Sequence, residues 1–488
     1  MLLLPLPLVA STLHRSVTST GNSAASCDVA VIGAGPGGVY AAWRLLKADP
    51  STSVCIFEAT ERAGGRIYSA RGLGPKGDLT AELGAYRFVR NWTKAYGHLY
   101  MWTPLTAALV ETALQLPIAQ YEPGDPTSFM YKIVDAAGHN AGYDTFVTKM
   151  LGEATAAGAR VEYKRRLVSI SGTAAAPVLH FAAGDDVKPG RVLLNLPQLP
   201  LLRLLSASPA LTRGRPFPPA LMAPSPTEGA KLYMYYPDAW WRNTLGLTSG
   251  EFYTTGAHNR SQAVTLTQRP SLAGRYHDGD VRCAAAGGGC RGFIEATYTY
   301  GDNARWFLAG VGSPAGVDGI YTTLNASDGA AGAFVLQQVH EVLVEYHKAA
   351  LENASTPGHN ATAAVAAMRP PFALLSYWGA QLPTYGGAIH QTKPGPLIDE
   401  GVVAPNAMAP FGDWPVYVAN EAFGALRGED GGLGGHHGWA ECSLVMAENV
   451  LVEKMGLKPP AWIDAAVYHE YVRYNKTKAA KRGGWAQG

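Results

Sequence analysis

A glycine-rich turn between two apolar segments is the feature that most constrains how this chain folds. Residues 29–32 form a short apolar run, residues 33–38 read Gly-Ala-Gly-Pro-Gly-Gly, and residues 39–46 have the pattern of a helix. A strand, a tight turn and a helix in this order present free backbone N–H groups and a partial positive charge at the start of the helix. The sequence therefore predicts the phosphate-binding corner of a dinucleotide-binding fold.

The individual residues of this corner have separate roles. Gly33 permits the tight turn, Gly35 lets the backbone approach a pyrophosphate, and Gly38 lets the helix pack closely on the sheet. Pro36 lies near the start of the helix, where a missing N–H group costs little. Glu58 closes the next apolar run at the distance expected for an acid that binds ribose hydroxyls.

A second glycine-rich segment indicates FAD rather than NAD. In residues 62–66 two adjacent glycines bring the backbone close to a cofactor, while Arg62 and Arg66 supply positive charge for phosphates. At this position the chain resembles the flavin-dependent amine oxidase superfamily, which carries a glycine-glycine-arginine segment just after the ribose-binding acid. Covalent members attach the flavin through a cysteine near their C-terminal segment. Cys442 lies past Trp439 in an apolar helical pattern, so we expect non-covalent FAD.

Composition fits a soluble globular enzyme of two or three domains. The chain has 488 residues, 47% hydrophobic and 16% charged, with a net charge of +2, so nothing in it favours nucleic acid or an anionic membrane as a partner. Residues 1–10 are nearly all apolar but too short to span a bilayer. We expect them to be the core of a signal peptide cut before Cys27, and no later run predicts a transmembrane span.

The cysteines and glycosylation sequons favour the secretory pathway. Cys283 and Cys290 could close a small surface disulfide loop, whereas Cys27, Cys55 and Cys442 lie in apolar contexts typical of buried core thiols. No Cys/His cluster has zinc spacing, so no metal is expected. The sequons of this predicted secreted glycoprotein begin at Asn91, Asn259, Asn325, Asn353, Asn360 and Asn475.

The predicted fold class is α/β, with a discontinuous Rossmann-like FAD-binding domain and a β-sheet-based substrate domain. Residues 231–236 and 293–300 predict long strands of a sheet separate from the first, and residues 333–345 predict a helix. The expected divisions are residues 1–26 for the leader, 27–70, 143–228 and 404–458 for the FAD-binding domain, 71–142 and 229–403 for the substrate domain, and 459–488 for a C-terminal tail.

The segment from Gly84 to Arg87 indicates the substrate class. In the amine oxidase superfamily a segment of this kind passes the flavin ring, and the L-amino-acid oxidase branch carries Gly-x-x-Arg there, which Gly84-Ala85-Tyr86-Arg87 matches. A guanidinium offers two parallel N–H donors to a substrate carboxylate. The alternative is that Arg87 binds a FAD phosphate or is a surface charge.

Lys231 is the candidate catalytic residue. The resemblance implies a lysine at the start of a strand that is bonded through water to the flavin N5 atom, where a positive group would help electron transfer to oxygen. The apolar and aromatic residues after Lys231 support such a strand. The alternative is an ordinary lysine at a strand edge.

The resemblance implies further site residues in the C-terminal half. Glu421 aligns with a glutamate near the ribityl or pyrophosphate region, although Asn420 stands where the family more often has glycine. Trp439 would form one wall of an aromatic cage. The remaining substrate candidates are Trp378, Tyr385 and Tyr253. The expected cofactor-binding residues are Gly33, Gly35, Pro36, Gly38, Glu58, Arg62, Gly65, Arg66, Gly84, Ala85, Tyr86, Arg87, Val168, Glu421, Gly438 and Trp439.

The function predicted from the sequence is a secreted, FAD-dependent L-amino-acid oxidase. It would convert amino acids to 2-oxo acids with release of ammonia and hydrogen peroxide, and its partners would be a small amino acid or amine and dioxygen. One alternative is a mono- or polyamine oxidase in which Arg87 is structural. Another is a secreted flavin-binding protein without turnover. A homo-oligomer is compatible with the sequence.

Overall fold

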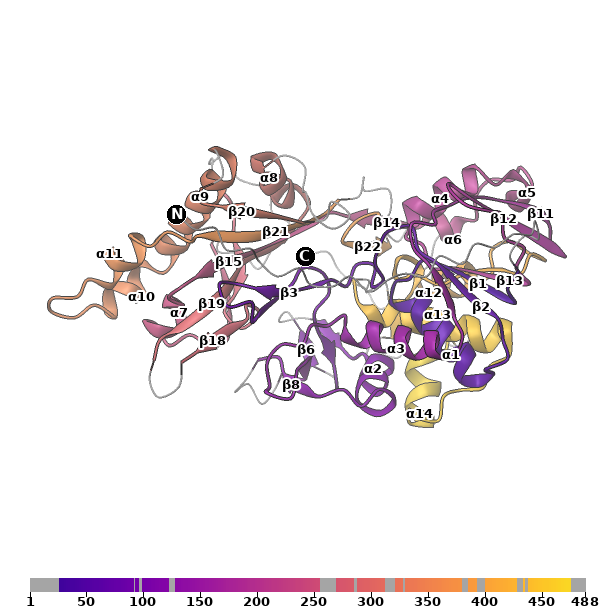
Figure 1. The fold of residues 1–488 in the computed structure, drawn as a ribbon, viewed down its shortest axis with the longest axis horizontal. Helices are drawn as coiled ribbons and strands as arrows, with labels where there is room; N and C mark the ends of the chain where they lie inside the picture. The colour runs from indigo at the N-terminus through magenta and orange to yellow at the C-terminus, as the bar shows by residue number, and fades with distance from the viewer. Residues whose placement is uncertain are drawn as a thin grey trace, which may run out of the picture.

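The computed structural model describes most of the chain as two large lobes (Figure 1). Residues 1–25 of the expected leader and the sequons at Asn259 and Asn475 lie outside the described residues. The described residues are 26–91, 93–95, 99–122, 128–254, 269–284, 288–311, 321–327, 330–379, 385–392, 400–427, 433–434 and 438–474.

One lobe is built on a five-stranded parallel sheet whose strands come from distant parts of the chain. The strand order is β10-β2-β1-β13-β23. Strands β1 and β2 are buried along their whole length, as expected for parallel strands covered on both faces. The bounds are β1 Val29–Ile32, β2 Val54–Phe57, β10 Arg160–Glu162, β13 Arg191–Leu194 and β23 Val416–Val418.

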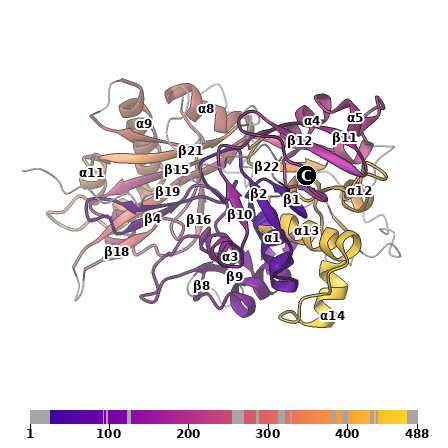
Figure 2. The same ribbon diagram turned by 45° about the vertical axis from the view of Figure 1, so that its right-hand side comes forward.

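Helices from both ends of the chain pack together beside this sheet. The helix α1, Pro36–Ala48, follows the glycine turn and packs against α13, Ala440–Met455, and α3, Thr145–Ala156. Between α1 and α13, Arg44 forms a buried ion pair with Glu448, with 3.1 Å between Nε and Oε2. The C-terminal segment therefore completes the domain that the N-terminal segment begins, as Figure 2 also shows for α1 and α13.

The second lobe contains a seven-stranded antiparallel sheet. Its order is β16-β17-β19-β15-β21-β20, with β18 paired to β19. The strand β15 lies in the middle of this sheet and all eight of its residues are buried. The bounds are β15 Gly229–Tyr236, β16 Glu251–Tyr253, β17 Ala273–Arg275, β18 Val281–Cys283, β19 Cys290–Tyr300, β20 Tyr321–Asn325, β21 Phe372–Trp378, α8 Gly301–Val311, α9 Ala330–Tyr346, α10 Lys348–Asn353 and α11 Ala361–Ala366.

A hairpin joins the two lobes. Its strands are β3, Ser69–Leu73, and β4, Leu79–Glu82, and the residues after β4 run along the end of the antiparallel sheet. Lys231 and Tyr233 of β15 both donate hydrogen bonds to the carbonyl oxygen of Glu82, at 3.0 and 3.1 Å. The backbone at residues 82–84 is therefore the junction between the two sheets.

Shorter elements connect these layers. They are β5 Phe88–Val89, β6 Thr93–Ala95, β7 Leu99–Met101, α2 Pro104–Ala108, η1 Leu109–Ala113, β8 Ile118–Gln120, β9 Met130–Ile133, β11 Leu167–Thr173, β12 Ala176–Phe181, α4 Gln198–Ser206, α5 Pro209–Thr212, α6 Pro219–Met222, β14 Pro224–Thr227, α7 Trp240–Asn243, β22 Ile389–Thr392, α12 Glu400–Ala407, η3 Glu421–Phe423, β24 Leu426–Arg427, β25 Leu433–Gly434, α14 Ala465–Val467 and η4 Tyr468–Val472.

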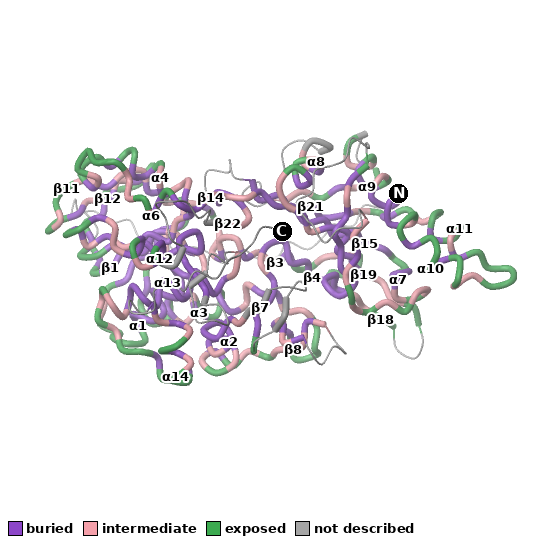
Figure 3. Tube along the Cα trace, turned by 180° about the vertical axis from the view of Figure 1, so that it is seen from behind, coloured by how far each residue is buried: buried purple, intermediate pink, exposed green. Residues whose placement is uncertain are grey.

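The predicted fold class is confirmed. The parallel sheet is Rossmann-like and discontinuous in sequence, and the expected long strands at residues 231–236 and 293–300 lie within β15 and β19 of a separate sheet. Burial is concentrated in both sheets and in α13, while α11 and α14 are largely exposed (Figure 3).

Within the described residues, no helix is long and apolar enough to cross a membrane. The same part of the chain holds no group of three or more His, Cys, Asp or Glu side chains that could bind a metal ion.

The cysteines differ in part from the sequence expectation. The Cys283–Cys290 disulfide is present, and Cys442 is a buried free thiol, as predicted. The prediction that Cys27 and Cys55 are core thiols is wrong, because they form a disulfide. Residue 27 precedes β1 and residue 55 lies in the neighbouring strand β2, so pairing of the two strands brings the side chains together. An apolar sequence context indicates that a cysteine is buried, but it does not identify the cysteine with which it forms a disulfide.

We expect the Cys27–Cys55 disulfide to stabilise the parallel sheet. It joins residues 28 apart in the sequence, so the double variant Cys27→Ala/Cys55→Ala should lose about 2–4 kcal/mol of unfolding free energy. Denaturant unfolding measures this loss. The control is Cys283→Ala/Cys290→Ala, which opens a loop of only 7 residues and should cost less. Thiol titration of the denatured, unreduced protein should find one thiol, and three would contradict the pairing.

Candidate active site

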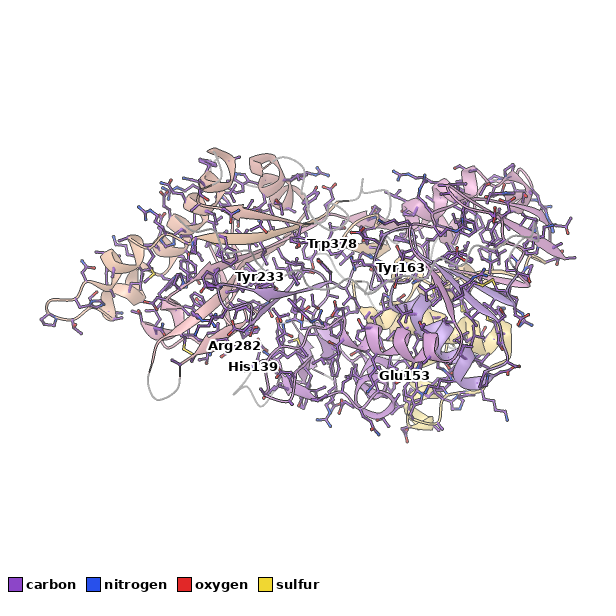
Figure 4. All side chains as sticks on the ribbon, in the orientation of Figure 1. His139, Glu153, Tyr163, Tyr233, Arg282 and Trp378 are labelled. Carbon is purple, nitrogen blue, oxygen red and sulfur yellow. A yellow bond between two sulfur atoms is a disulfide. The ribbon has the colours of Figure 1, made fainter. Side chains whose placement is uncertain are left out.

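A cavity of about 390 Å³ runs from the glycine turn to the antiparallel sheet. It opens at the carboxyl ends of β1, β2 and β13, where ligands bind in open parallel α/β sheets. At its other side it is lined by Lys231 and Trp378. Trp378 lies between the two lobes in Figure 4, whereas Tyr233 lies within the second lobe.

The glycine turn forms the floor of this cavity without side chains. Gly33 has a φ of +98°, in the left-handed region that favours glycine. A Cβ atom on Gly38 would lie 2.1 Å from the carbonyl oxygen of Gly33, so only glycine lets α1 approach β1 this closely. Gly35 and Pro36 line the cavity at the start of α1. The turn therefore provides the close backbone approach that a pyrophosphate requires.

Glu58 fixes the turn from the end of β2. Its Oε2 accepts a hydrogen bond from the backbone N–H of Ala34 at 2.7 Å, and its Oε1 accepts from the N–H and the hydroxyl of Thr60, both at 2.9 Å. The carboxylate also lines the cavity. Each carboxylate oxygen can accept more than one bond, so Glu58 can still accept ribose hydroxyls.

Asn195 is a cavity residue that the sequence reasoning missed. It follows β13, and its amide donates to the carbonyl of Gly33 at 3.3 Å while its oxygen accepts from Asn420 at 3.2 Å and from Ser443 at 3.3 Å. This one side chain links the glycine turn, the segment after β23 and α13. Asn195 lies at the end of a predicted parallel strand, and ligands bind at the carboxyl ends of such strands, so its position could have indicated a role in the site.

The two arginines of the second glycine-rich segment point in different directions. Arg62 donates to the carbonyl oxygens of Gly65 at 2.5 Å and Ile67 at 3.2 Å, so it holds the loop and lies outside the cavity lining. Arg66 lines the cavity and forms an ion pair with Glu421, with 2.7 Å between Nη2 and Oε2. Arg66 is thus the arginine of this segment that can meet a bound anion.

Glu421 organises the wall opposite the glycine turn. Its Oε1 accepts from the N–H groups of His390 at 3.1 Å and Gly438 at 2.7 Å, and its Oε2 lies 2.9 Å from the Nδ1 atom of His390. His390 is fully buried and also lies 3.2 Å from Arg66. The sequence reasoning missed His390, because no pattern around it distinguishes it from a core residue. Glu421 therefore positions Arg66 and the Gly438–Trp439 segment.

Lys231 lines the cavity from a position near the start of the strand β15. Its ammonium donates to the carbonyl oxygens of Glu82 at 3.0 Å and Gly84 at 2.8 Å, and it lies 3.7 Å from the centre of the Tyr86 ring. Burial lowers the pKa of Lys231 to about 7, and the neighbouring Glu295 and Glu82 oppose that effect. The side chain can therefore change its charge near neutral pH.

Aromatic side chains surround this end of the cavity. Trp378 donates from Nε1 to the carbonyl of Leu83 at 2.7 Å and packs edge-on against Tyr385, with ring centres 5.2 Å apart. Trp439 lines the cavity where α13 begins. Tyr298 of β19, which the sequence reasoning missed, also lines it, and its ring centre lies 4.7 Å from the Lys231 ammonium.

Arg87 lies behind the cavity wall. It is 4% exposed, and its guanidinium carbon lies 4.7 Å from the ring centres of both Tyr86 and Tyr121 and 6.0 Å from that of Trp439. Tyr253 lies on the edge strand β16, where its hydroxyl donates to Glu251. Neither Arg87 nor Tyr253 lines the cavity.

Most of the sequence candidates therefore meet at one cavity. The candidates that line it are Gly33, Gly35, Pro36, Glu58, Gly65, Arg66, Gly84, Ala85, Val168, Lys231, Trp378, Tyr385, Glu421, Gly438 and Trp439. The candidates outside the lining are Gly38, Arg62, Tyr86, Arg87 and Tyr253.

Comparisons with known proteins agree with this geometry. Residues 31–100 match the family model of the NAD(P)-binding Rossmann-like domain. Over 74 residues the chain is 40% identical to achacin of Lissachatina fulica; that stretch is 15% of this chain and 13% of achacin, so the chain matches a small part of that relative's length.

The similarity to solved structures extends over most of the chain. Wild-type putrescine oxidase bound to putrescine superposes with a TM-score of 0.52 and 14% identity, over 89% of this chain and 100% of that chain. A redesigned cofactor-binding variant of the same enzyme gives a TM-score of 0.52 over 99% of its chain.

Fold and site thus define a protein with a Rossmann-like dinucleotide-binding domain and a second, antiparallel sheet over its cavity. More particularly, the chain has the fold of putrescine oxidase and a short segment similar to achacin, in agreement with the resemblance stated from the sequence.

We expect Gly38→Ala to abolish dinucleotide binding. The added methyl group would collide with the carbonyl of Gly33 and displace the turn from the cavity. The measurement is the ratio of visible flavin absorbance to protein absorbance after purification, with circular dichroism to confirm a folded chain. Gly152→Ala is the matched control, since nothing lies within 4 Å of the added atom and helix α3 should gain about 1 kcal/mol. Full flavin content in Gly38→Ala would refute this account of the turn.

Proposed function

We propose that this protein is an FAD-dependent oxidase of L-amino acids, which it converts to 2-oxo acids with release of ammonia and hydrogen peroxide. The observation that carries the proposal is the buried guanidinium of Arg87, which lies behind the cavity wall, 6.0 Å from the ring centre of the cavity-lining Trp439. A buried guanidinium beside aromatic walls suits the recognition of a carboxylate.

The residues of the cavity fit a non-covalent FAD. Glycine backbone at the turn, Glu58 beside it and the cationic Arg66 match a pyrophosphate and a ribose, and Val168 lines the cavity where the resemblance implies the adenine. Cys442 is fully buried in α13 and does not line the cavity, which supports a non-covalent cofactor. Acid precipitation should leave the flavin in the supernatant.

Bound FAD would supply a hydride acceptor that is reoxidised by dioxygen. Arg87 would fix the substrate carboxylate and so orient the Cα–H bond, which is the positioning that an oxidation of this kind requires. Trp439, Tyr298 and Trp378 would exclude water from the reacting end of the cavity. Lys231 would hold a positive charge where negative charge develops during electron transfer to oxygen.

The second candidate is an oxidase of amines without a carboxylate. Arg87 lies outside the cavity lining, and its guanidinium packs against the rings of Tyr86 and Tyr121. This favours a structural Arg87, as does the similarity in fold to putrescine oxidase.

Anaerobic addition of substrates separates these candidates. A mixture of L-amino acids should bleach the visible flavin absorbance of the purified protein, and an equal concentration of putrescine and other amines should not. Bleaching by amines alone would establish the second candidate. A flavin that neither mixture reduces, but that dithionite does reduce, would leave a flavin-binding protein without turnover.

We also propose that the protein passes through the secretory pathway. The two disulfides support this, as do the exposed sequon residues Asn353 and Asn360. Digestion of the protein from its native source with an endoglycosidase should lower its apparent mass, and an unchanged mass would contradict glycosylation.

Arg87→Leu should reduce the affinity for amino acids far more than the FAD content. Removal of the guanidinium leaves the substrate carboxylate unpaired in a dry pocket, and we expect a loss of about 2–5 kcal/mol in transition-state interaction. The comparison of kcat/KM for the variant and the wild type gives this value. Arg90→Leu is the control, since Arg90 is exposed and pairs with Glu111. Parallel loss of FAD and activity would make Arg87 a folding or cofactor residue.

The charge of Lys231 should control the reaction with oxygen. The ammonium loses its proton as the pH rises through its pKa of about 7, so reoxidation of the dithionite-reduced protein should slow over that range. Lys231→Met should reoxidise slowly at every pH but be reduced by substrate at a near-normal rate. Stopped-flow absorbance follows both steps. Normal reoxidation in the variant would make Lys231 a structural residue of β15.

A further inference from the structure

Charged side chains of alternating sign cross the antiparallel sheet and end at Lys231. Glu251 on β16 lies opposite Arg275 on β17, and Arg275 lies opposite Glu295 on β19. Arg275 binds both carboxylates, with 2.5 Å from Nε to Glu251 Oε1 and 3.2 Å from Nη1 to Glu295 Oε2. Lys231 on β15 follows, with 3.9 Å between its Nζ and Glu295 Oε1. We call these four residues the charge ladder.

Three of the four members of the charge ladder are shielded from water. Lys231 is 2% exposed, Arg275 is 1% exposed, and Glu295 is fully buried. An ion in such a place is stable only if an opposite charge and hydrogen bonds replace its hydration. The charge on each of these groups therefore depends on its neighbours in the ladder.

Glu295 is held in a fixed position at the centre of the ladder. It accepts a hydrogen bond from the Tyr233 hydroxyl at 3.2 Å in addition to its bond with Arg275. Burial opposes its ionisation, but Lys231 and Arg275 outweigh that effect and keep the pKa of Glu295 below its usual range. Burial raises the pKa of the neighbouring Asp278 well above its usual range, and the charge of Glu295 raises it further.

We propose that Glu295 is a positioning residue that keeps the Lys231 side chain cationic and fixed at the cavity wall. The inference rests on the role in the oxygen reaction proposed above for Lys231. Glu295 does not line the cavity, so it acts through Lys231 and not on the substrate.

The other groups that face Lys231 do not replace Glu295. The carboxyl group of Glu82 is bonded to the hydroxyl of Ser69 at 2.6 Å and the N–H of Tyr143 at 2.9 Å, and burial raises its pKa to about 7. The guanidinium groups of Arg87 and Arg275 oppose a charge on Lys231. The rings of Tyr86, Tyr233 and Tyr298 and the carbonyls of residues 82 and 84 favour the charge but carry none themselves.

Glu295→Gln tests the proposal in the FAD-bound protein. Two readouts follow the charge of Lys231 against pH: the visible spectrum of the oxidised flavin, which needs no turnover, and the rate of reoxidation after dithionite reduction. In the wild type both should change with a midpoint near pH 7, and in Lys231→Met neither should change there. Loss of a negative charge at this distance should move the midpoint in Glu295→Gln down by about 1–3 pH units.

Two further variants complete the test. Asp278→Asn is the matched control, because it removes a second buried carboxyl group beside Arg275, with 3.6 Å between Nη1 and Oδ2, and its midpoint should move far less than that of Glu295→Gln. Glu295→Asp keeps the charge but withdraws it from Lys231, so its midpoint should move down by less than that of Glu295→Gln. It decides the question if Glu295→Gln does not fold or bind FAD.

The outcomes separate this inference from the proposed function. An unshifted midpoint in Glu295→Gln or Glu295→Asp, alongside a transition that Lys231→Met abolishes, overturns the role of Glu295 and leaves that of Lys231 intact. Normal reoxidation of Lys231→Met contradicts the proposed role of Lys231, while the flavin spectrum still reports whether Glu295 sets its charge. A wild-type spectrum without any transition that depends on Lys231 overturns the inference.

Discussion

The geometry of the molecule depends on the carbonyl groups of residues 82–84, which join the two sheets. The carbonyl of Glu82 accepts from Lys231 and Tyr233, and that of Leu83 accepts from the hydroxyl of Ser376 at 3.0 Å and from the indole of Trp378 at 2.7 Å. These donors all come from β15 and β21, two neighbouring strands of the antiparallel sheet. Buried carbonyl groups need partners, and here one extended segment obtains them entirely from the neighbouring lobe. The position of the antiparallel sheet relative to the cavity is thereby set by backbone acceptors on one side and by four side-chain donors on the other.

This junction also fixes the loop that carries Arg66, whose positively charged side chain lines the cavity. The N–H of Ala85 donates to the carbonyl of Arg66 at 3.1 Å, and the N–H of Leu83 donates to that of Tyr68 at 2.8 Å. A Cβ atom on Gly84 would lie 2.1 Å from the carbonyl oxygen of Arg66, so glycine is required where the two segments cross. The guanidinium of Arg66 and the ammonium of Lys231 are therefore placed by the same segment. This explains why residues far apart in the sequence line one cavity.

The sequence predicted those parts of the site whose function follows from local spacing. The glycine turn, Glu58 and the second glycine-rich segment are short patterns, and each has a physical requirement that few residue types satisfy. Asn195 and His390 act through contacts with residues more than a hundred positions away, and nothing in their own segments reveals those contacts. The Cys27–Cys55 disulfide was missed for the same reason, because its partner is defined by strand pairing. The separate roles of Arg62 and Arg66 required the direction of each side chain, which a sequence motif does not contain.

The charge of Lys231 depends on two opposing effects, of which burial is the larger. Burial alone would strongly favour the neutral amine, yet its pKa falls only to about 7, a change of about 5 kcal/mol relative to an exposed lysine. A carboxylate 3.9 Å away stabilises the ammonium by about 4 kcal/mol at an effective dielectric constant of ~20. Because Glu295 and Glu82 offset only part of the burial effect, the pKa of Lys231 lies near 7. The antiparallel sheet, with Glu295 ordered by Arg275 and Tyr233, therefore determines the electrostatics at the cavity wall, while the parallel sheet determines where a dinucleotide is held.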